Sequence, residues 1–410
     1  MRVFRNLLWL VVVLLVLQVI KVILSRQGFA GFSLLVIIVG CLQFLLVQGA
    51  LFVWLCAWVF KRFLRSTHPV RHALMAFTGV VIGVECLLAW WMHHPQQLPK
   101  VLRTSYGYYY DYFQEDLLQF DKRYAVYDPG LFYTLKPGAR FNFSNIEFSN
   151  EYRTNRLGMR DEDSSLRAPE VVCIGDSYTM GWGVEQSACY PSKLRDICGL
   201  RVANMGMASY GTARELASLG RVDTSRMQWL IIQYCTNDQD ENRGAVEHGY
   251  RLPISSAENY ADLVRAAADS RIYFPGKYSL IIGNFFEKSC INKLYPFFKL
   301  RWERRDWGKQ QEEQARVFLD VLSHAAIDFN KVRVIVTMMD DHRNMKGDFL
   351  QSVQQLYDTG PYKARFGAGL KVVNVEPLLS KKDLYTLDVH FRASAHIKIA
   401  WALLNAMKSF

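Results

Sequence analysis

The sequence predicts an α/β domain with a central parallel sheet, preceded by three transmembrane helices. Two observations support this prediction. Three long apolar runs occupy residues 7–24, 33–60 and 73–92 near the start of the 410-residue chain. From residue 169 onward, short apolar runs alternate with helical patterns, which is typical of a parallel sheet made of strand–helix–strand units.

These patterns divide the chain into three parts. We predict a membrane domain over residues 1–95 and a connector with short strands and turns over 96–168. The α/β domain follows over 169–410 and holds a long insert at about 240–330. The insert has more residues than one helix that connects two parallel strands needs.

Each apolar run is long enough to cross a bilayer, which takes about 20 residues. The first run resembles a signal peptide in position, but two further runs follow at once and no small-residue cleavage site is evident, so we predict retained helices. Basic residues favour the cytoplasmic side. They precede the first run and crowd the loop before the third, at Arg2, Arg5, Lys61, Arg62, Arg65 and Arg71. We therefore predict an integral membrane protein with a cytoplasmic N-terminus and an extracytoplasmic α/β domain.

Glu85 lies inside the third apolar run, where a carboxylate is a functional candidate. Lys21 lies at a similar depth in the first run. We expect a structural Lys21–Glu85 ion pair, with no part in catalysis.

Composition narrows the class of partner. The net charge is +11 and aromatic residues make up 14% of the chain. No recognition helix, zinc finger or RNA-binding signature is present, so we expect contact with membrane lipids and not with nucleic acid. A helix would hold Cys189 and Cys198 roughly 13 Å apart, too far for a disulfide, which predicts free thiols.

The α/β domain begins with a strand at residues 171–175. Further strands are predicted at 201–204, 229–234, 332–337 and 370–375, with helices at 189–199 and 395–407. In the connector, residues 128–161 indicate short strands and turns. The tyrosine-rich stretch 105–113 is either a stacking platform for a sugar or an interfacial and packing segment.

Polar residues follow three successive strands. Ser177, Gly206 and Asn237 come directly after them, and Asp388 and His390 stand near the C-terminus. The carboxyl ends of parallel strands form one edge of the sheet, where ligands bind. Acyl transfer needs a hydroxyl nucleophile, a base, a group that orients the base, and donors for the oxyanion. The sequence supplies each of these parts.

At these residues the chain resembles the SGNH (GDSL-like) hydrolase family. Gly175-Asp176-Ser177 is similar to its first block, Asn204-Met205-Gly206 to its second, Asn237-Asp238 to its third, and Asp388 with His390 to its last. The resemblance implies a flavodoxin-type sandwich without a cofactor. It also implies a Ser177–His390–Asp388 triad, with oxyanion donors from Ser177, Gly206 and Asn237. Three departures are Cys235 for glycine, a single residue between Asp388 and His390, and Ala395 for glycine.

The resemblance implies a serine esterase, or an acyltransferase, acting on an acylated saccharide or lipid. The resemblance to polysaccharide-modifying relatives favours an O-acetyl group on a cell-envelope saccharide as the substrate. The alternative is a non-catalytic membrane protein that uses this fold to bind a glycan or a protein partner. Replacing Ser177 separates the two, because a binding protein keeps its function without the hydroxyl.

Other polar residues have simpler interpretations. His342 is a reserve base, and His396 is a structural or supporting residue. Asp238, Asp240 and Glu241 lack the ligand pattern of a calcium loop, so we predict no metal. Within the insert, apolar residues 278–286 precede interleaved aromatic and basic residues. This segment is either an interfacial element on anionic lipid or a helical cap on the domain.

Overall fold

The computed structural model describes residues 49–65, 67–94, 97, 117–145, 147–279, 307–340, 348–385 and 388–410. The chain divides into two compact units. The larger unit comprises Leu117–Leu263 and Glu303–Phe410, and the smaller comprises Met1–Asp116 and Val264–Trp302. The hairpins of the connector belong to the same unit as the sheet.

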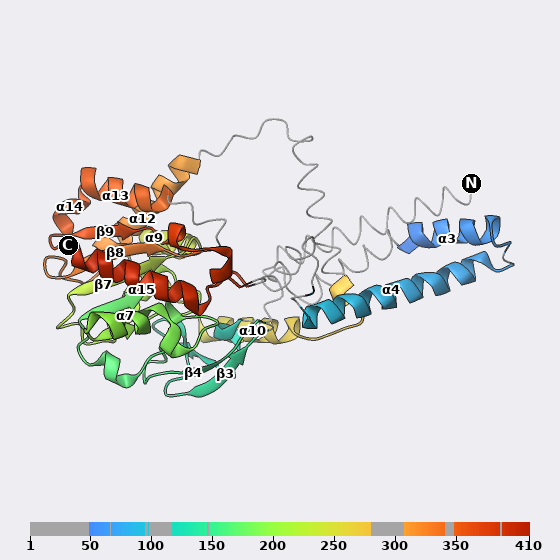
Figure 1. The fold of residues 1–410 in the computed structure, drawn as a ribbon, viewed down its shortest axis with the longest axis horizontal. Coiled ribbons are helices and arrows are strands. Elements are labelled where there is room, and N and C mark those ends of the chain that lie inside the picture. The colour runs from blue at the N-terminus through green and yellow to red at the C-terminus, as the bar shows by residue number, and fades with distance from the viewer. Residues whose placement is uncertain are drawn as a thin grey trace. The chain divides into compact units, whose positions relative to one another are not determined.

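A parallel five-stranded sheet with the order β6-β5-β7-β8-β9 is the centre of the larger unit (Figure 1). Every residue of β5, β6 and β7 is buried, as their apolar sequences require. The interior strand β5 pairs in parallel with β6 on one side and β7 on the other. The α/β fold with a parallel sheet is therefore confirmed. The strands are β5 (Val171–Ile174), β6 (Val202–Asn204), β7 (Trp229–Tyr234), β8 (Arg333–Met338) and β9 (Leu370–Val373).

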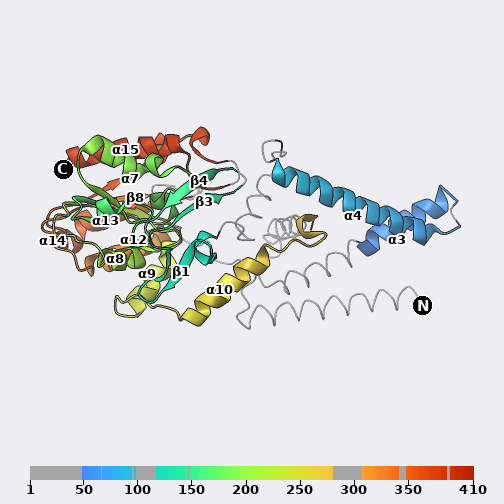
Figure 2. The same ribbon diagram turned by 90° about the horizontal axis from the view of Figure 1, so that it is seen from below.

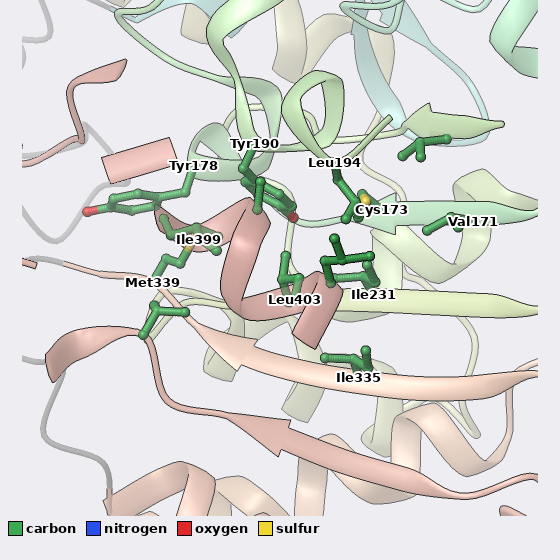
Figure 3. Packing of buried hydrophobic residues seen from close by; sticks show 14 of the residues in the cluster. Val171, Cys173, Tyr178, Tyr190, Leu194, Ile231, Ile335, Met339, Ile399 and Leu403 are labelled. Carbon is green, nitrogen blue, oxygen red and sulfur yellow. The ribbon is translucent and has the colours of Figure 1, made fainter. Parts of the chain in front are cut away.

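Helices cover both faces of this sheet (Figures 1 and 2). On one face, α7 (Tyr190–Cys198) and α15 (Ala393–Lys408) bury a core that includes Cys173, Ile231 and Leu403 (Figure 3). On the other, Tyr234 stacks on Phe349 with ring centroids 3.8 Å apart. Further helices of the unit are α6 (Ser177–Met180), α8 (Thr212–Leu219), α9 (Asp238–Glu247), α12 (Trp307–Ser323), α13 (Asp348–Thr359) and α14 (Tyr362–Arg365).

Two antiparallel hairpins precede the sheet in the chain. They are β1 (Ala125–Asp128) with β2 (Phe132–Leu135), and β3 (Arg140–Ser144) with β4 (Ser149–Arg153). Arg160, only 1% exposed, joins the second hairpin to the loop that follows α6. Its guanidinium lies 3.6 Å from the centre of the Tyr152 ring and donates to the carbonyls of Gly181 and Val184.

Short 3₁₀ turns complete the larger unit. They are η3 (Leu118–Phe120), η4 (Asp163–Leu166), η5 (Gln186–Ala188), η6 (Glu376–Leu378) and η7 (Lys381–Asp383). The insert contributes α10 (Ala257–Ser270).

The smaller unit contains α3 (Ala50–Arg62) and α4 (Pro69–His93), which pack together through Phe52 and Phe77. Among the described residues, one helix is long and apolar enough to cross a membrane, at Pro69–Trp91, where three had been predicted. Its length and composition match the third predicted span. The first predicted span, and the second up to residue 48, lie outside the described residues.

Glu85 of α4 is buried and accepts hydrogen bonds from the insert. Its Oε2 accepts from the backbone N–H of Ser279 at 2.8 Å and from the Ser279 hydroxyl at 2.7 Å. Its Oε1 accepts from the Tyr278 N–H at 3.1 Å and the Tyr273 hydroxyl at 3.3 Å. The predicted partner, Lys21, lies outside the described residues, as do the tyrosine-rich stretch 105–113 and the aromatic and basic stretch 280–306.

Candidate active site

Ser177 follows the turn at the end of β5, an interior strand of the sheet. Gly175 ends the extended segment, and a β-carbon there would lie 2.1 Å from the Thr179 hydroxyl, so a side chain does not fit. The Asp176 carboxylate then caps α6 by accepting the Tyr178 N–H at 3.0 Å. Burial raises the pKa of Asp176 to about 6. Ser177 is the first residue of α6 and is 9% exposed.

The structure brings Ser177, His390 and Asp388 together, although 213 positions separate the serine from the histidine. The Ser177 Oγ lies 2.7 Å from His390 Nε2. On the other side of the ring, His390 Nδ1 lies 2.5 Å from Asp388 Oδ1. This order of hydroxyl, imidazole and carboxylate is that of a general-base triad. The single residue between Asp388 and His390 is thus compatible with the geometry.

The turn that carries His390 is held from several sides. The Tyr178 hydroxyl donates to the carbonyl of Val389 at 3.2 Å. The Trp182 ring stacks on the His390 ring with centroids 5.1 Å apart. Phe391, immediately after the histidine, is fully buried in the core against α15. The imidazole is therefore positioned by packing as well as by Asp388.

The Asp388 carboxylate is nearly buried, with 10% of its side chain exposed. Its Oδ2 accepts from Trp182 Nε1 at 3.0 Å and from Asn145 Nδ2 at 3.1 Å. Burial by itself would raise the pKa of Asp388. The charge of His390 and hydrogen bonds from His390 and Trp182 outweigh burial and hold that pKa below its usual value. Asp388 is consequently an anion at neutral pH, as a residue that orients imidazolium must be.

The predicted oxyanion donor Gly206 differs from the structure. Its backbone N–H donates to Asn204 Oδ1 at 3.0 Å and is therefore already engaged. A β-carbon at Gly206 would lie 2.3 Å from the backbone nitrogen of Met180, so this glycine allows the loop to pack on α6. The side chain of Asn204, two residues earlier, therefore accepts from the N–H group that the prediction assigned to the oxyanion.

Ser209 was missed by the sequence and has the features that Gly206 lacks. It is exposed and adopts φ of +60°, which is uncommon for a residue other than glycine. Its N–H has no hydrogen-bond acceptor in the described part of the chain, and its hydroxyl accepts from Gln119 at 3.0 Å. A backbone donor leaves no signature in the residue type, so only the conformation could reveal it.

Asn237 stands at the expected place, between β7 and α9. Its side chain is exposed and makes no capping hydrogen bond to α9. The simplest structural explanation for an asparagine at a helix start, that it caps the helix, therefore does not apply. Cys235, which replaces the usual glycine, is buried in the core, and burial raises its pKa well above the ordinary value for a thiol.

The other candidate residues make contacts that explain them as structural residues. His396 is buried, its Nδ1 accepts the Tyr190 N–H at 3.2 Å, and burial lowers its pKa to about 3. Asp238 accepts from the Thr212 hydroxyl at 2.7 Å, and Glu241 pairs with Arg214 at 2.5 Å. Within the described residues, no group of three or more His, Cys, Asp or Glu is placed to hold a metal. His342 lies outside the described residues.

The cysteines in the described segments are free thiols. Cys189 is buried at the start of α7, and Cys198 ends the same helix.

Comparison with known proteins agrees with the fold. The model of the GDSL-like Lipase/Acylhydrolase family matches residues 173–395, more than half of the chain. No curated protein matches the sequence. The matched stretch begins in β5 and ends in α15, and it contains Ser177, Asp388 and His390. The chain therefore belongs to the GDSL-like lipase/acylhydrolase family.

Proposed function

We propose that this protein is a membrane-anchored serine esterase or O-acyltransferase that acts on an acylated saccharide or lipid of the cell envelope. The observation that supports it best is the continuous chain of hydrogen-bond distances from Ser177 through His390 to Asp388. Family membership supports acylhydrolase chemistry in general. The O-acetyl group is the acyl group we favour.

In the proposed reaction, Ser177 Oγ attacks the ester carbonyl while His390 Nε2 takes its proton. The leaving alcohol receives that proton from His390, and an acyl group remains on Ser177. Water or a sugar hydroxyl then attacks the acyl-enzyme, with His390 as base again. Asp388 accepts a hydrogen bond from the Nδ1–H group of His390, which leaves Nε2 unprotonated and able to take the proton of Ser177. Asp388 also stabilises the imidazolium that forms.

We assign the oxyanion donors to the backbone N–H groups of Ser177 and Ser209 and the side-chain amide of Asn237. All three follow the carboxyl ends of neighbouring strands β5, β6 and β7. The loop that carries Ser209 runs beside the nucleophile turn, since the Met207 N–H donates to the Gly175 carbonyl at 3.0 Å. Losing one donor of this kind costs about 10²–10³ in turnover. No cofactor is required.

We place the α/β domain outside the cytoplasmic membrane, with the N-terminus in the cytoplasm. The apolar helix at Pro69–Trp91 supports an anchor by length and composition. Large side chains on α3 and α4, such as Trp54, Met75 and Ile82, are more than half exposed and suit a lipid environment. Basic residues at the facing ends of α3 and α4 and in the loop between them, Lys61, Arg62, Arg65 and Arg71, support the orientation.

The test is labelling of the detergent-solubilised full chain with a serine-reactive fluorophosphonate, located by mass spectrometry. We expect an adduct on Ser177 that is absent in a folded His390→Ala variant, because the hydroxyl is nucleophilic only beside its base. A folded wild-type protein that neither labels nor cleaves a small acetyl ester would favour a non-catalytic binding protein instead.

A further inference from the structure

We propose that the β3–β4 hairpin is part of the catalytic machinery and that Asn145, in its turn, is a positioning residue for Asp388. This inference rests on the proposed function, because it assigns a task within the same triad. The hairpin precedes the stretch that matches the family, which starts at residue 173. The family resemblance therefore gives it no role.

Asn145 binds the oxygen of Asp388 that the histidine does not use. Asp388 Oδ1 accepts from His390, from both Nδ1 at 2.5 Å and the backbone N–H at 2.9 Å. Asp388 Oδ2 accepts from Asn145 Nδ2 and Trp182 Nε1. A carboxylate held by one oxygen alone can rotate about its Cβ–Cγ bond. Donors on both oxygens determine the plane of the carboxylate, and thereby the plane of the His390 ring.

The turn itself determines how the Asn145 amide is oriented. Asn145 Oδ1 accepts from the backbone N–H groups of Glu147 at 2.8 Å and Phe148 at 3.1 Å. The oxygen is thereby committed to the turn, so the NH₂ group must face Asp388. A swap of the amide nitrogen and oxygen would break both turn hydrogen bonds and set an oxygen against the carboxylate.

Two further contacts join the hairpin to the triad. Glu147 Oε2 accepts the backbone N–H of Asp388 at 2.8 Å, which anchors the main chain of that residue. Phe143 meets the Trp182 ring edge-on at 4.8 Å, and Trp182 in turn stacks on His390. The hairpin therefore supports both the carboxylate and the ring on which imidazole orientation depends.

Asn145→Asp tests the proposal with little change in shape. The substituted carboxylate keeps an oxygen for Glu147 and Phe148 but presents a second negative oxygen to Asp388 in place of a donor. The added charge favours imidazolium at His390, so we expect the acid limb of the pH profile of kcat/KM to move up by about one pH unit. We expect kcat at the plateau to fall about tenfold or more, with KM nearly unchanged, since Asn145 is not assigned any contact with substrate.

Asn142→Asp is the matched control, because Asn142 is exposed on β3 of the same hairpin and receives the same change of charge. Both variants and the wild type are compared as full-length protein in detergent, with p-nitrophenyl acetate and the fluorophosphonate as probes. Melting temperature is measured in parallel.

The outcomes separate the two proposals. An Asn145→Asp profile that coincides with that of Asn142→Asp overturns the role of Asn145. A loss of kcat with an unmoved acid limb and a lower melting temperature also overturns it, because Asn145 would then only form the turn. A folded wild type without Ser177-dependent activity overturns the proposed function and this inference with it.

Discussion

Gly206 is a residue at which even the smallest side chain does not fit. A β-carbon there lies 2.3 Å from the nitrogen of Met180 and 2.7 Å from the carbonyl carbon of Thr179, both backbone atoms of α6. We expect Gly206→Ala to displace α6, destabilising the protein by about 1–3 kcal/mol and lowering Ser177 labelling at least tenfold. Thermal unfolding and the fluorophosphonate labelling rate measure the two effects.

Gly244→Ala is the control for that substitution. Gly244 lies in α9, and its nearest neighbour to a new β-carbon is 3.8 Å away. Alanine is the better helix former, so stability should stay equal or rise. A Gly206→Ala protein as stable and reactive as Gly244→Ala would contradict the close packing of this loop on α6.

Among single residues, those with reactive side chains could be predicted from the sequence. The residues that hold them in position could not. Ser177, Asp388 and His390 were recognised because hydroxyl, acid and imidazole followed apolar strands in the expected order. Asn145 and Trp182 were not, since their contacts with Asp388 cross 243 and 206 positions of the chain. Nothing local marks an asparagine in a hairpin turn as a donor to a distant carboxylate.

Helices α8 and α9 bury two carboxylates between them. Glu215 is fully buried, and neither of its side-chain oxygens has a hydrogen-bond partner within the described residues. Burial, followed by the charge of Asp238, raises the pKa of Glu215 well above its ordinary value. Burial and nearby acids likewise raise the pKa of Asp238. Glu215 is therefore protonated in the fold at a pH where the unfolded chain has lost that proton.

This arrangement predicts a stability that falls as pH rises. A raised pKa in the fold means that the native state binds more protons, so stability is greatest below the unfolded pKa of about 4 and is lost above it. Between the unfolded-state pKa and the folded-state pKa of Glu215, each pH unit lowers the free energy of unfolding by about 1.4 kcal/mol. Glu215→Gln, which mimics the protonated acid, should flatten the decline in melting temperature as the pH rises above the unfolded pKa of the glutamate.

Glu247→Gln provides the comparison, because Glu247 is an exposed residue of α9. Its melting temperatures should follow the wild type across the same range. If Glu215→Gln also followed the wild type, the buried acid would not be the origin of the pH dependence.

Among the elements, the strands were the most predictable. Their apolar runs, such as Val171–Ile174 and Trp229–Tyr234, match strands that are buried on both sides. The four-residue helix α6 was not foreseen, because its formation depends on Asp176 capping and on the loop at Gly206. Whether the insert contacts lipid or caps the domain stays a prediction, since the aromatic and basic residues that suggest it lie outside the described residues.

For the molecule as a whole, Glu85 joins two parts of the chain that are distant in sequence. Four donors between Tyr273 and Ser279 converge on its carboxylate in α4. We expect Glu85→Gln to lower stability by about 1–3 kcal/mol, because an amide offers one acceptor oxygen and leaves backbone N–H groups unpaired. Melting temperature in detergent measures this loss.

Ser177 labelling should persist in the Glu85→Gln protein at temperatures where it remains folded. Ser279→Ala, which removes one of the four donors, should cost less than the change at Glu85. A folded Glu85→Gln protein that no longer labels would show that the carboxylate acts in catalysis and not as an anchor.

The three-part organisation along the chain stays a prediction. The α/β fold is present as predicted, and one apolar helix matches a predicted span. Hydropathy shows which segments suit lipid, but a partner such as the one found for Glu85 depends on how the insert folds back. The spacing of residues along an apolar run does not indicate how the insert folds back to contact Glu85.

The separation of the triad along the chain also has a consequence for synthesis. Ser177 leaves the ribosome 213 residues before His390. At about 5–20 residues per second, roughly 10–40 s pass between them. In that interval β6 through β9 are made, and α15 follows His390. A nascent chain therefore carries Ser177 without His390 throughout this interval, and the contact between the two side chains can form only after the whole sheet has been synthesised.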